Sequence, residues 1–245
     1  MLKGTCTWVI LGSLLVFVAG SRIAWAQPAL TPDYLEHEDV PPPLLFREVW
    51  QQPPHTGPLN DQNRRITQQA LTDSDLQLHL YGPDVSDVQV AVHHGLHDLW
   101  TGFTTSPVAV TLSDRKGYLD LTGLARLRWL ARTEDLHILH PVVKLADGTL
   151  LAGSQTFQSP QRPMDGKNDV NAYSGDFVVA DITFDDQRWF KLDPVRIVTT
   201  REVAHPDLRR VAEIGFVDLM PGGGHGFAGC SNVSWIELYA QVHPR

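Results

Sequence analysis

Three side chains near the C-terminus alternate along one predicted strand. In the segment SWIELYAQV, Trp235, Glu237 and Tyr239 fall on one face, because successive side chains of a β-strand point to opposite faces. Aromatic rings stack on the apolar C–H faces of sugars, and a carboxylate accepts hydrogen bonds from sugar hydroxyls. We therefore predict that these three residues bind ligand. The alternative is that the same face is covered by other chain segments and belongs to the core.

A glycine-rich loop leads into this strand. The segment MPGGGHGFAGC, residues 220–230, lacks the Lys-Ser/Thr pair of a phosphate-binding loop, and a strand rather than a helix follows it. Glycine permits positive φ and close backbone approach. We predict that His225 and Phe227 join the ligand-binding set, the alternative being a plain connection between two strands. Cys230 is expected to be a small buried hydrophobe, or a reactive thiol if it is exposed beside His225.

Two further groups of polar side chains could do chemistry. His93, His94 and His97 could bind a metal, but their segment lacks the glutamate of the zinc-protease helix, so we predict a polar loop or strand end. A glycosidase needs two carboxylates held across one cleft, whereas turns use aspartate without any catalytic role. The acids that leave both interpretations open surround RWF and are Asp181, Asp185, Asp186 and Asp193.

The elements that must position these residues read mainly as strands. The segments LQLHLYG, VQVAV and VAVTL have apolar residues with a period of two, which is typical of strands. The segment LLFREVW follows three prolines and is the first strand candidate. The run from Leu121 to Arg132 fits a helix as well as a strand, and we predict a strand from about Ala125. Asp147-Gly148 predicts a hairpin turn, and only HPDLRRVAE suggests a helical turn. Many short strands without alternating helices predict an all-β, antiparallel sandwich or jelly roll.

The N-terminal residues have the pattern of a secretory signal. A short positive start, an apolar run from Trp8 to Ala19 and the small residues of Ala24-Trp25-Ala26 predict a signal peptide over 1–26, cleaved before Gln27. Residues 27–43 are proline-rich and acidic and predict a linker, so residues 44–245 form the domain. We expect an exported, periplasmic or extracellular protein without a membrane span after processing. The net charge of −8 argues against nucleic acid as a partner.

The strand pattern resembles that of galactose-binding-like β-sandwiches, the superfamily of secreted carbohydrate-binding modules and of the complex I intermediate-associated protein domain. The segments that carry the resemblance are YLDLTGLARLRWLAR, DFVVADITFDDQRWFKLD and VAEIGFVDL with VSWIELY. The resemblance implies a jelly roll of two sheets, of the galactose-binding-like type, that often binds sugars. It also implies a structural calcium ion, for which Glu48 and Glu237 are the candidate ligands.

These observations predict an exported, non-catalytic protein that binds carbohydrate or a similar polar ligand. One alternative is a lyase or hydrolase acting on polysaccharide with a histidine as base. The sequence has no Gly-x-Ser-x-Gly motif, the elbow that presents a serine nucleophile in α/β-hydrolases. A second alternative is a structural or assembly protein whose partner is another exported protein. A histidine with a shifted pKa in a cleft beside acids would favour the enzyme.

Overall fold

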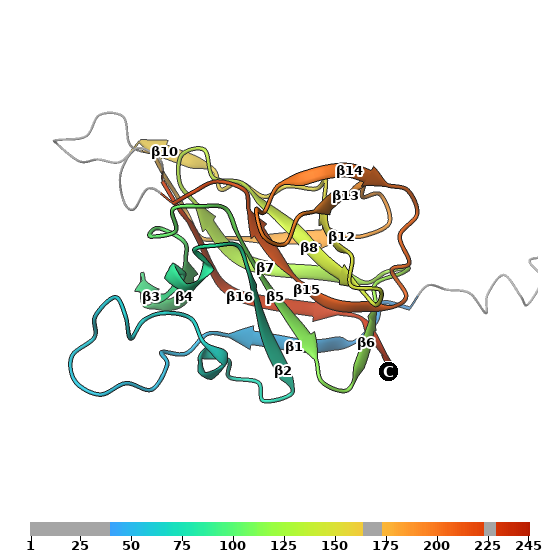
Figure 1. Ribbon diagram of the computed structural model, residues 1–245, viewed down its shortest axis with the longest axis horizontal. Helices are drawn as coiled ribbons and strands as arrows, with labels where there is room; N and C mark the ends of the chain where they lie inside the picture. Colours follow the sequence, from blue (N-terminus) through green and yellow to red (C-terminus); the bar gives the residue numbers. More distant parts are fainter. Residues whose placement is uncertain (1–39, 164–172, 223–228) are drawn as a thin grey trace, which may run out of the picture. The chain divides into compact units, whose positions relative to one another are not determined.

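The computed structural model describes residues 40–163, 173–222 and 229–245, and in these ranges the chain is built from strands and two short 3₁₀ turns. The strands form a six-stranded and a nine-stranded sheet, both antiparallel, with a separate two-stranded pair (Figure 1). The predicted all-β antiparallel sandwich is therefore confirmed.

The six-stranded sheet has the order β12-β7-β16-β4-β3, and β1 also pairs with β16. Its strands are β1 (Leu44–Val49), β3 (Gln89–His93), β4 (Leu96–Trp100), β7 (Arg126–Thr133), β12 (Val178–Thr183) and β16 (Ser231–Tyr239). β4 and β1 contact successive parts of β16, the first at Asn232 and Val233 and the second from Trp235 onward. The predicted strand from about Ala125 is found as β7.

The nine-stranded sheet has the order β14-β13-β9-β8-β15-β5-β2, with β6 also paired to β15 and β17 paired to β6. Its strands are β2 (Leu76–Tyr81), β5 (Val108–Asp114), β6 (Gly117–Asp120), β8 (Leu139–Leu145), β9 (Leu150–Gly153), β13 (Trp189–Leu192), β14 (Thr199–Val203), β15 (Val211–Asp218) and β17 (Gln241–Pro244). The two-stranded pair is β10 (Gln161–Pro163) with β11 (Tyr173–Gly175), and the 3₁₀ turns are η1 (Gln68–Ala70) and η2 (Val85–Asp87).

The main core lies between the two sheets and uses one face of each. Trp129 of β7 and Phe216 of β15 meet edge to face across it, with ring centroids 6.5 Å apart, and both side chains are fully buried. Trp189 and Phe184 stack beside them. Burying one such side chain is worth roughly 1.5–3 kcal/mol, so this inter-sheet layer supplies the main stabilisation of the sandwich.

Two tight turns follow from local sequence. His94 and Gly95 both have positive φ, 53° and 79°, as the type I′ turn of a two-residue hairpin requires. The segment HHGLHDLW is thus the β3–β4 hairpin: His93 ends β3 and His94 lies in the turn, as the predicted strand end or polar loop requires, and His97 lies on β4. Asp147-Gly148 connects β8 to β9 as predicted, with Gly148 at φ 86°.

Two local predictions need correction. The last strand is not continuous: β16 ends at Tyr239, and residues from Gln241 pair with β6 in the other sheet, which places the C-terminus beside β6 (Figure 1). The segment HPDLRRVAE contains a turn followed by the start of β15, because its apolar residues are needed in the sheet. Among the described residues, no helix has the length and apolar character needed to cross a membrane.

Candidate functional site

The predicted ligand-binding face of β16 exists, and arginines from neighbouring strands occupy it. Trp235, Glu237 and Tyr239 share one face, and Glu237 lies opposite Arg47 of β1 and Arg128 of β7. The carboxylate of Glu237 is 3.3 Å from Arg47 Nη1 and 3.1 Å from Arg128 Nη1. Both carboxylate oxygens of Glu237 therefore already have cationic partners, which compete with any sugar hydroxyl.

The aromatic rings of this face are also in contact with guanidinium groups. Arg47 lies over the Trp235 ring at 4.8 Å from its centroid, and Arg126 lies over the Tyr239 ring at 4.5 Å. Such cation–π contacts use the ring faces on which a sugar would stack. The assignment of these residues to ligand binding stays a prediction, and it now requires the arginines to move. His225 and Phe227, predicted to join them, lie outside the described residues.

The two candidate calcium ligands are not brought together. Glu48 follows Arg47, which is the cross-strand partner of Glu237. The cross-strand partner of Glu48 itself is Ile236, whose side chain is buried in the core. Because side chains alternate, Glu48 and Glu237 point to opposite faces of the sheet. Glu48 instead accepts hydrogen bonds from the backbone N–H groups of Thr72 and Asp73, at 2.7 and 3.1 Å. The prediction that Glu48 and Glu237 bind one calcium ion together is therefore wrong, because the two carboxylates lie on opposite faces of the sheet.

No group of three or more metal-capable side chains is positioned to hold an ion in the described ranges. Burial raises the pKa of Glu48 above its ordinary value, against the opposing effect of the hydrogen bonds from Thr72 and Asp73. With the hydroxyl of Thr72 as a third donor, the Glu48 carboxyl group fixes the backbone at Thr72 and Asp73, which is a structural role. The calcium ion itself stays a prediction.

A pocket of about 370 Å³ lies elsewhere on the six-stranded sheet, beside its edge strand β3, and we call it the β3–β4 pocket. Its walls come from the β3–β4 hairpin and from the segment that precedes η1. The residues that line it are Gln52, Leu59, Asp61, Arg64, Val90, Ala91, Val92, His93, Trp100 and Phe103. Sequence reasoning singled out the hairpin for its histidines but not for this pocket.

Two aromatic side chains form the apolar wall of the pocket. Trp100 and Phe103 meet edge to face with centroids 4.6 Å apart, and Phe103 keeps 44% of its surface exposed whereas Trp100 is buried. A Cβ on the intervening Gly102 would lie 2.1 Å from the Trp100 ring, so only glycine permits this packing. Leu59 and Val92, both exposed, extend the apolar surface.

Polar groups converge on the same space. Asp61 and Arg64 line the pocket, and within the described ranges their side chains make no hydrogen bond or ion pair with the protein. The amide of Gln52 donates to the backbone oxygen of Asn63 at 3.0 Å and is held in place by that bond. An open aromatic ring, one anionic acceptor and one cationic donor therefore face a common cavity.

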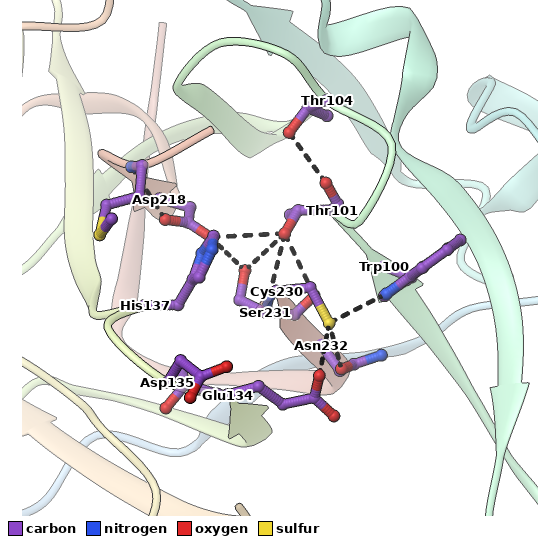
Figure 2. Close-up of polar contacts among 12 residues, drawn as sticks. Trp100, Thr101, Thr104, Glu134, Asp135, His137, Asp218, Cys230, Ser231 and Asn232 are labelled. Atoms are coloured by element: carbon purple, nitrogen blue, oxygen red, sulfur yellow. Dashed lines mark hydrogen bonds and ion pairs between the residues drawn. The ribbon is translucent and has the colours of Figure 1, made fainter. Parts of the chain in front are cut away.

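Trp100, which lines the β3–β4 pocket, is joined to a network of buried polar side chains, part of which is drawn in Figure 2. Trp100 donates its indole N–H to Cys230 Sγ at 3.0 Å, and the Cys230 thiol in turn lies 3.3 Å from Glu134 Oε2. Glu134 pairs with Arg132 at 3.1 Å. Burial, reinforced by Glu134, raises the pKa of Cys230 well above its ordinary value. Cys230 is therefore a protonated, buried thiol, as the first of its two predicted roles requires.

A second branch of the network holds the histidine of the hairpin. His93 Nδ1 is 2.9 Å from Asp98 Oδ2, and Asn232 donates from its amide nitrogen to Asp98 Oδ1 at 2.7 Å. Arg132 donates to Asn232 Oδ1, which joins this branch to Glu134. The polar residues of the hairpin thus connect β3 and β4 to β16 and β7, so the His93 wall of the pocket is rigidly positioned.

A third branch lies deeper and resembles a catalytic triad only in composition. Asp218 Oδ2 is 2.6 Å from both His137 Nδ1 and Ser231 Oγ, and Thr101 Oγ1 is 3.1 Å from Ser231 Oγ (Figure 2). In a nucleophilic triad the serine bonds to the histidine, whereas here the serine and the histidine share one carboxylate oxygen. All four side chains are fully buried, so this branch joins β15 to the six-stranded sheet and is structural.

Comparison with known proteins adds information on the fold alone. No model of a known family matches the chain, and no curated protein matches it. Among solved structures it is similar to the carbohydrate-binding module CtCBM11, with 11% identity and a TM-score of 0.35 over 80% of this chain and 96% of that one. It is also similar to an exo-β-agarase, with 11% identity and a TM-score of 0.37 over 71% of this chain.

A third similar structure is PfGH50B, with 11% identity and a TM-score of 0.38 over 71% of this chain. The chain spans only 24% and 23% of the length of the agarase and PfGH50B chains. These similarities, like the resemblance to galactose-binding-like sandwiches, are likenesses of fold. At these identities and TM-scores they carry no argument about ligand or activity, which must come from the geometry of the site.

Proposed function

We propose that this protein binds carbohydrate in the β3–β4 pocket. The observation that carries the proposal is the exposed ring of Phe103 beside Asp61 and Arg64, two charged side chains without a protein partner among the described residues. A sugar presents an apolar C–H face for the ring and hydroxyls that both donate and accept. Asp61 accepts from such hydroxyls, Arg64 donates to them, and Trp100 forms the floor.

The size and support of the pocket are consistent with a binding site. Its volume lies within the range of roughly 300–1,000 Å³ that is usual for small-molecule sites. The network through Cys230 and Asp98 holds Trp100 and His93 before any ligand arrives, and a preorganised wall reduces the entropy that binding must overcome. The binding step needs no chemistry by the protein.

The rival interpretation as a docking surface for another protein is less well supported. Leu59, Val92 and Phe103 are exposed apolar side chains, and a contiguous apolar patch would favour a protein partner. Here they surround a concave space that contains Asp61 and Arg64. A protein interface depletes charge at its centre, whereas a sugar site needs it.

We further propose that the protein is exported after cleavage before Gln27, so that the pocket meets extracellular or periplasmic glycans. The predicted signal lies in residues 1–26 and supports this proposal by its sequence pattern alone. Mass spectrometry of protein recovered outside the cytoplasm should find Gln27 at the N-terminus. Recovery of Met1 there would contradict the proposal.

The experiment that tests binding is a glycan-array screen followed by calorimetry with the selected oligosaccharide. Phe103→Ala should weaken binding about tenfold or more, equivalent to ~1.4 kcal/mol, because it removes the stacking ring. Phe190→Ala is the matched control, since Phe190 is a half-buried ring of β13 that Arg188 covers at 5.3 Å. This control should leave affinity unchanged.

Trp235→Ala distinguishes the pocket from the face of β16. If Trp235→Ala weakens binding and Phe103→Ala does not, the ligand binds on the β16 face and the pocket assignment is wrong. If neither variant alters binding while both remain folded, or if the array shows no binding at all, the proposed function itself is wrong.

A further inference from the structure

A serine, a histidine and a glutamate lie together on the outer face of the nine-stranded sheet. His79 Nε2 is 2.9 Å from Ser113 Oγ, and His79 Nδ1 is 3.8 Å from Glu213 Oε1. The histidine therefore lies between the hydroxyl and the carboxylate. This is the order of contacts in a nucleophilic triad, in contrast to the buried group around Asp218.

The sheet brings these residues together from three neighbouring strands. His79 is on β2, Ser113 on β5 and Glu213 on β15, and the order of the strands is β15-β5-β2. Leu112 and Ile214 are cross-strand partners and are buried in the inter-sheet core. Because side chains alternate, Ser113 and Glu213 must point to the opposite, outer face.

Glu213 is held as an ionised acceptor. Its carboxylate accepts hydrogen bonds from Thr111 Oγ1 at 2.6 Å, Tyr81 Oη at 2.7 Å and Lys144 Nζ at 2.9 Å. Burial alone would raise the pKa of Glu213, but these three bonds outweigh burial and lower it. Glu213 is thus a fixed negative charge 3.8 Å from His79 Nδ1, beyond hydrogen-bond distance, and it acts on the imidazole through that charge.

His79 has the protonation state that a general base needs. Burial lowers the pKa of His79 below its ordinary value, and although Glu213 acts to raise it, Lys144, Arg245 and Arg115 act to lower it further. The imidazole is therefore neutral at neutral pH. In the tautomer with its proton on Nδ1, which faces Glu213, Nε2 is free to accept the proton of the Ser113 hydroxyl.

A cavity gives substrate access to this group. A pocket of about 230 Å³ is lined by His79, Ser113 and Glu213, so the serine reaches it even though most of the residue is buried. Lys144 and Arg245 line the same pocket; Lys144 is paired with Glu213 at 2.9 Å, so Arg245 is the cation there that Glu213 does not neutralise. Positive charge next to a nucleophile stabilises the oxyanion that forms when the nucleophile adds to a carbonyl group.

We propose that Ser113, His79 and Glu213 form an acyl-transfer centre that hydrolyses small carboxylic esters. Ser113 Oγ adds to the ester carbonyl carbon while His79 Nε2 takes the hydroxyl proton, and the carbonyl oxygen becomes the oxyanion. The C–O bond to the alcohol then breaks, and His79 returns the proton to the leaving alcohol. Ser113 and His79 are the catalytic residues and Glu213 is a positioning residue.

Hydrolysis of the acyl-serine completes the cycle without any further reagent. A water molecule adds to the acyl carbon as His79 Nε2 takes one of its protons. The bond from the acyl carbon to Ser113 Oγ breaks, and the proton passes from His79 to the serine oxygen. The products are one carboxylic acid and one alcohol, so the ester and water balance.

The first test uses the full chain, 4-nitrophenyl acetate as substrate and a fluorophosphonate as a serine-directed probe. Ser113→Ala should reduce protein-dependent hydrolysis by about 100-fold or more, toward the buffer rate. Peptide mapping should place the fluorophosphonate on Ser113 of the unaltered chain, a result that does not depend on whether any variant folds. Ser234→Ala is the matched control, because Ser234 is also a buried strand serine and donates to the backbone oxygen of His97.

The second test separates positioning from mere structure through the pH profile. The rate should fall on acidification through a His79 pKa below its ordinary ~6.5. Because the charge of Glu213 raises that pKa, Glu213→Gln should move this limb to still lower pH, whereas a purely structural loss would lower the rate without moving it. Full activity in folded Ser113→Ala, labelling at another residue, or hydrolysis by the unaltered chain no faster than by free imidazole would overturn the proposal.

Discussion

Trp100 donates its indole N–H to the Sγ of Cys230 across 3.0 Å, and the two residues are 130 positions apart in the chain. This bond ties the floor of the β3–β4 pocket to the start of β16. Cys230 also lies 3.3 Å from the carboxylate of Glu134, so the sulfur both accepts and donates. A residue of the glycine-rich segment thus supports the pocket from behind, rather than contributing a reactive group to its surface.

The thiol of Cys230 should be inert in the folded protein. Burial raises its pKa well above the ordinary value, and the thiolate is the species that reacts with alkylating agents. Iodoacetamide at neutral pH should leave the Cys230 peptide unmodified in native protein and modify it after denaturation, as read by peptide mapping. Rapid modification of that peptide in the native state would mean that the site is open.

Gly102→Ala should damage the pocket more than the fold. A Cβ at this position would lie 2.1 Å from the Trp100 ring, so the ring must move, and such overpacking costs roughly 1–3 kcal/mol of the free energy of unfolding. Ligand affinity should fall as the Trp100 floor shifts. Calorimetry and denaturant unfolding measure the two effects.

Gly123→Ala is the control for this change. Gly123 has φ 61° with open space around its Cβ position, so alanine there introduces backbone strain without a clash. Its cost of about 1 kcal/mol in stability should come with unchanged affinity. Equal losses of affinity in both variants would show that the effect of Gly102→Ala is not specific to the pocket.

Two buried carboxyl groups should affect stability with opposite dependence on pH. Burial raises the pKa of Glu48, so the unfolded chain ionises first, and the contribution of Glu48 to stability declines as pH rises from the unfolded value of 4.5 through its folded pKa. Burial acts to raise the pKa of Glu213 as well, but its hydrogen bonds lower it below 4.5. The contribution of Glu213 is therefore present above 4.5 and is lost as pH falls through its folded pKa.

Denaturant unfolding of Glu48→Gln and Glu213→Gln against pH measures this difference. The stability of the unaltered chain relative to Glu48→Gln should fall with rising pH above 4.5, and relative to Glu213→Gln it should rise with pH below 4.5. Slopes of the same sign for both variants would show that one of the two carboxyl groups is not held as described.

The local features of this protein follow from its sequence alone. The period of two predicted β2, β5 and the strand after Ala125, and Asp147-Gly148 predicted a hairpin. The same alternation placed Trp235, Glu237 and Tyr239 on one face, and the structure confirms that they share it. These features depend on neighbours only a few residues away, because alternation and turn conformation are set by the local backbone.

The residues that lie against each face depend on the tertiary fold. Arg47 and Arg126 cover the rings of Trp235 and Tyr239 because β1 and β7 pair with β16 in a particular register, which the sequence of β16 does not contain. Long-range pairing likewise placed Glu48 and Glu237 on opposite faces. It also assembled Ser113 with His79 from separate strands. Register and strand order depend on contacts distant in sequence, so residue spacing along one strand cannot reveal them.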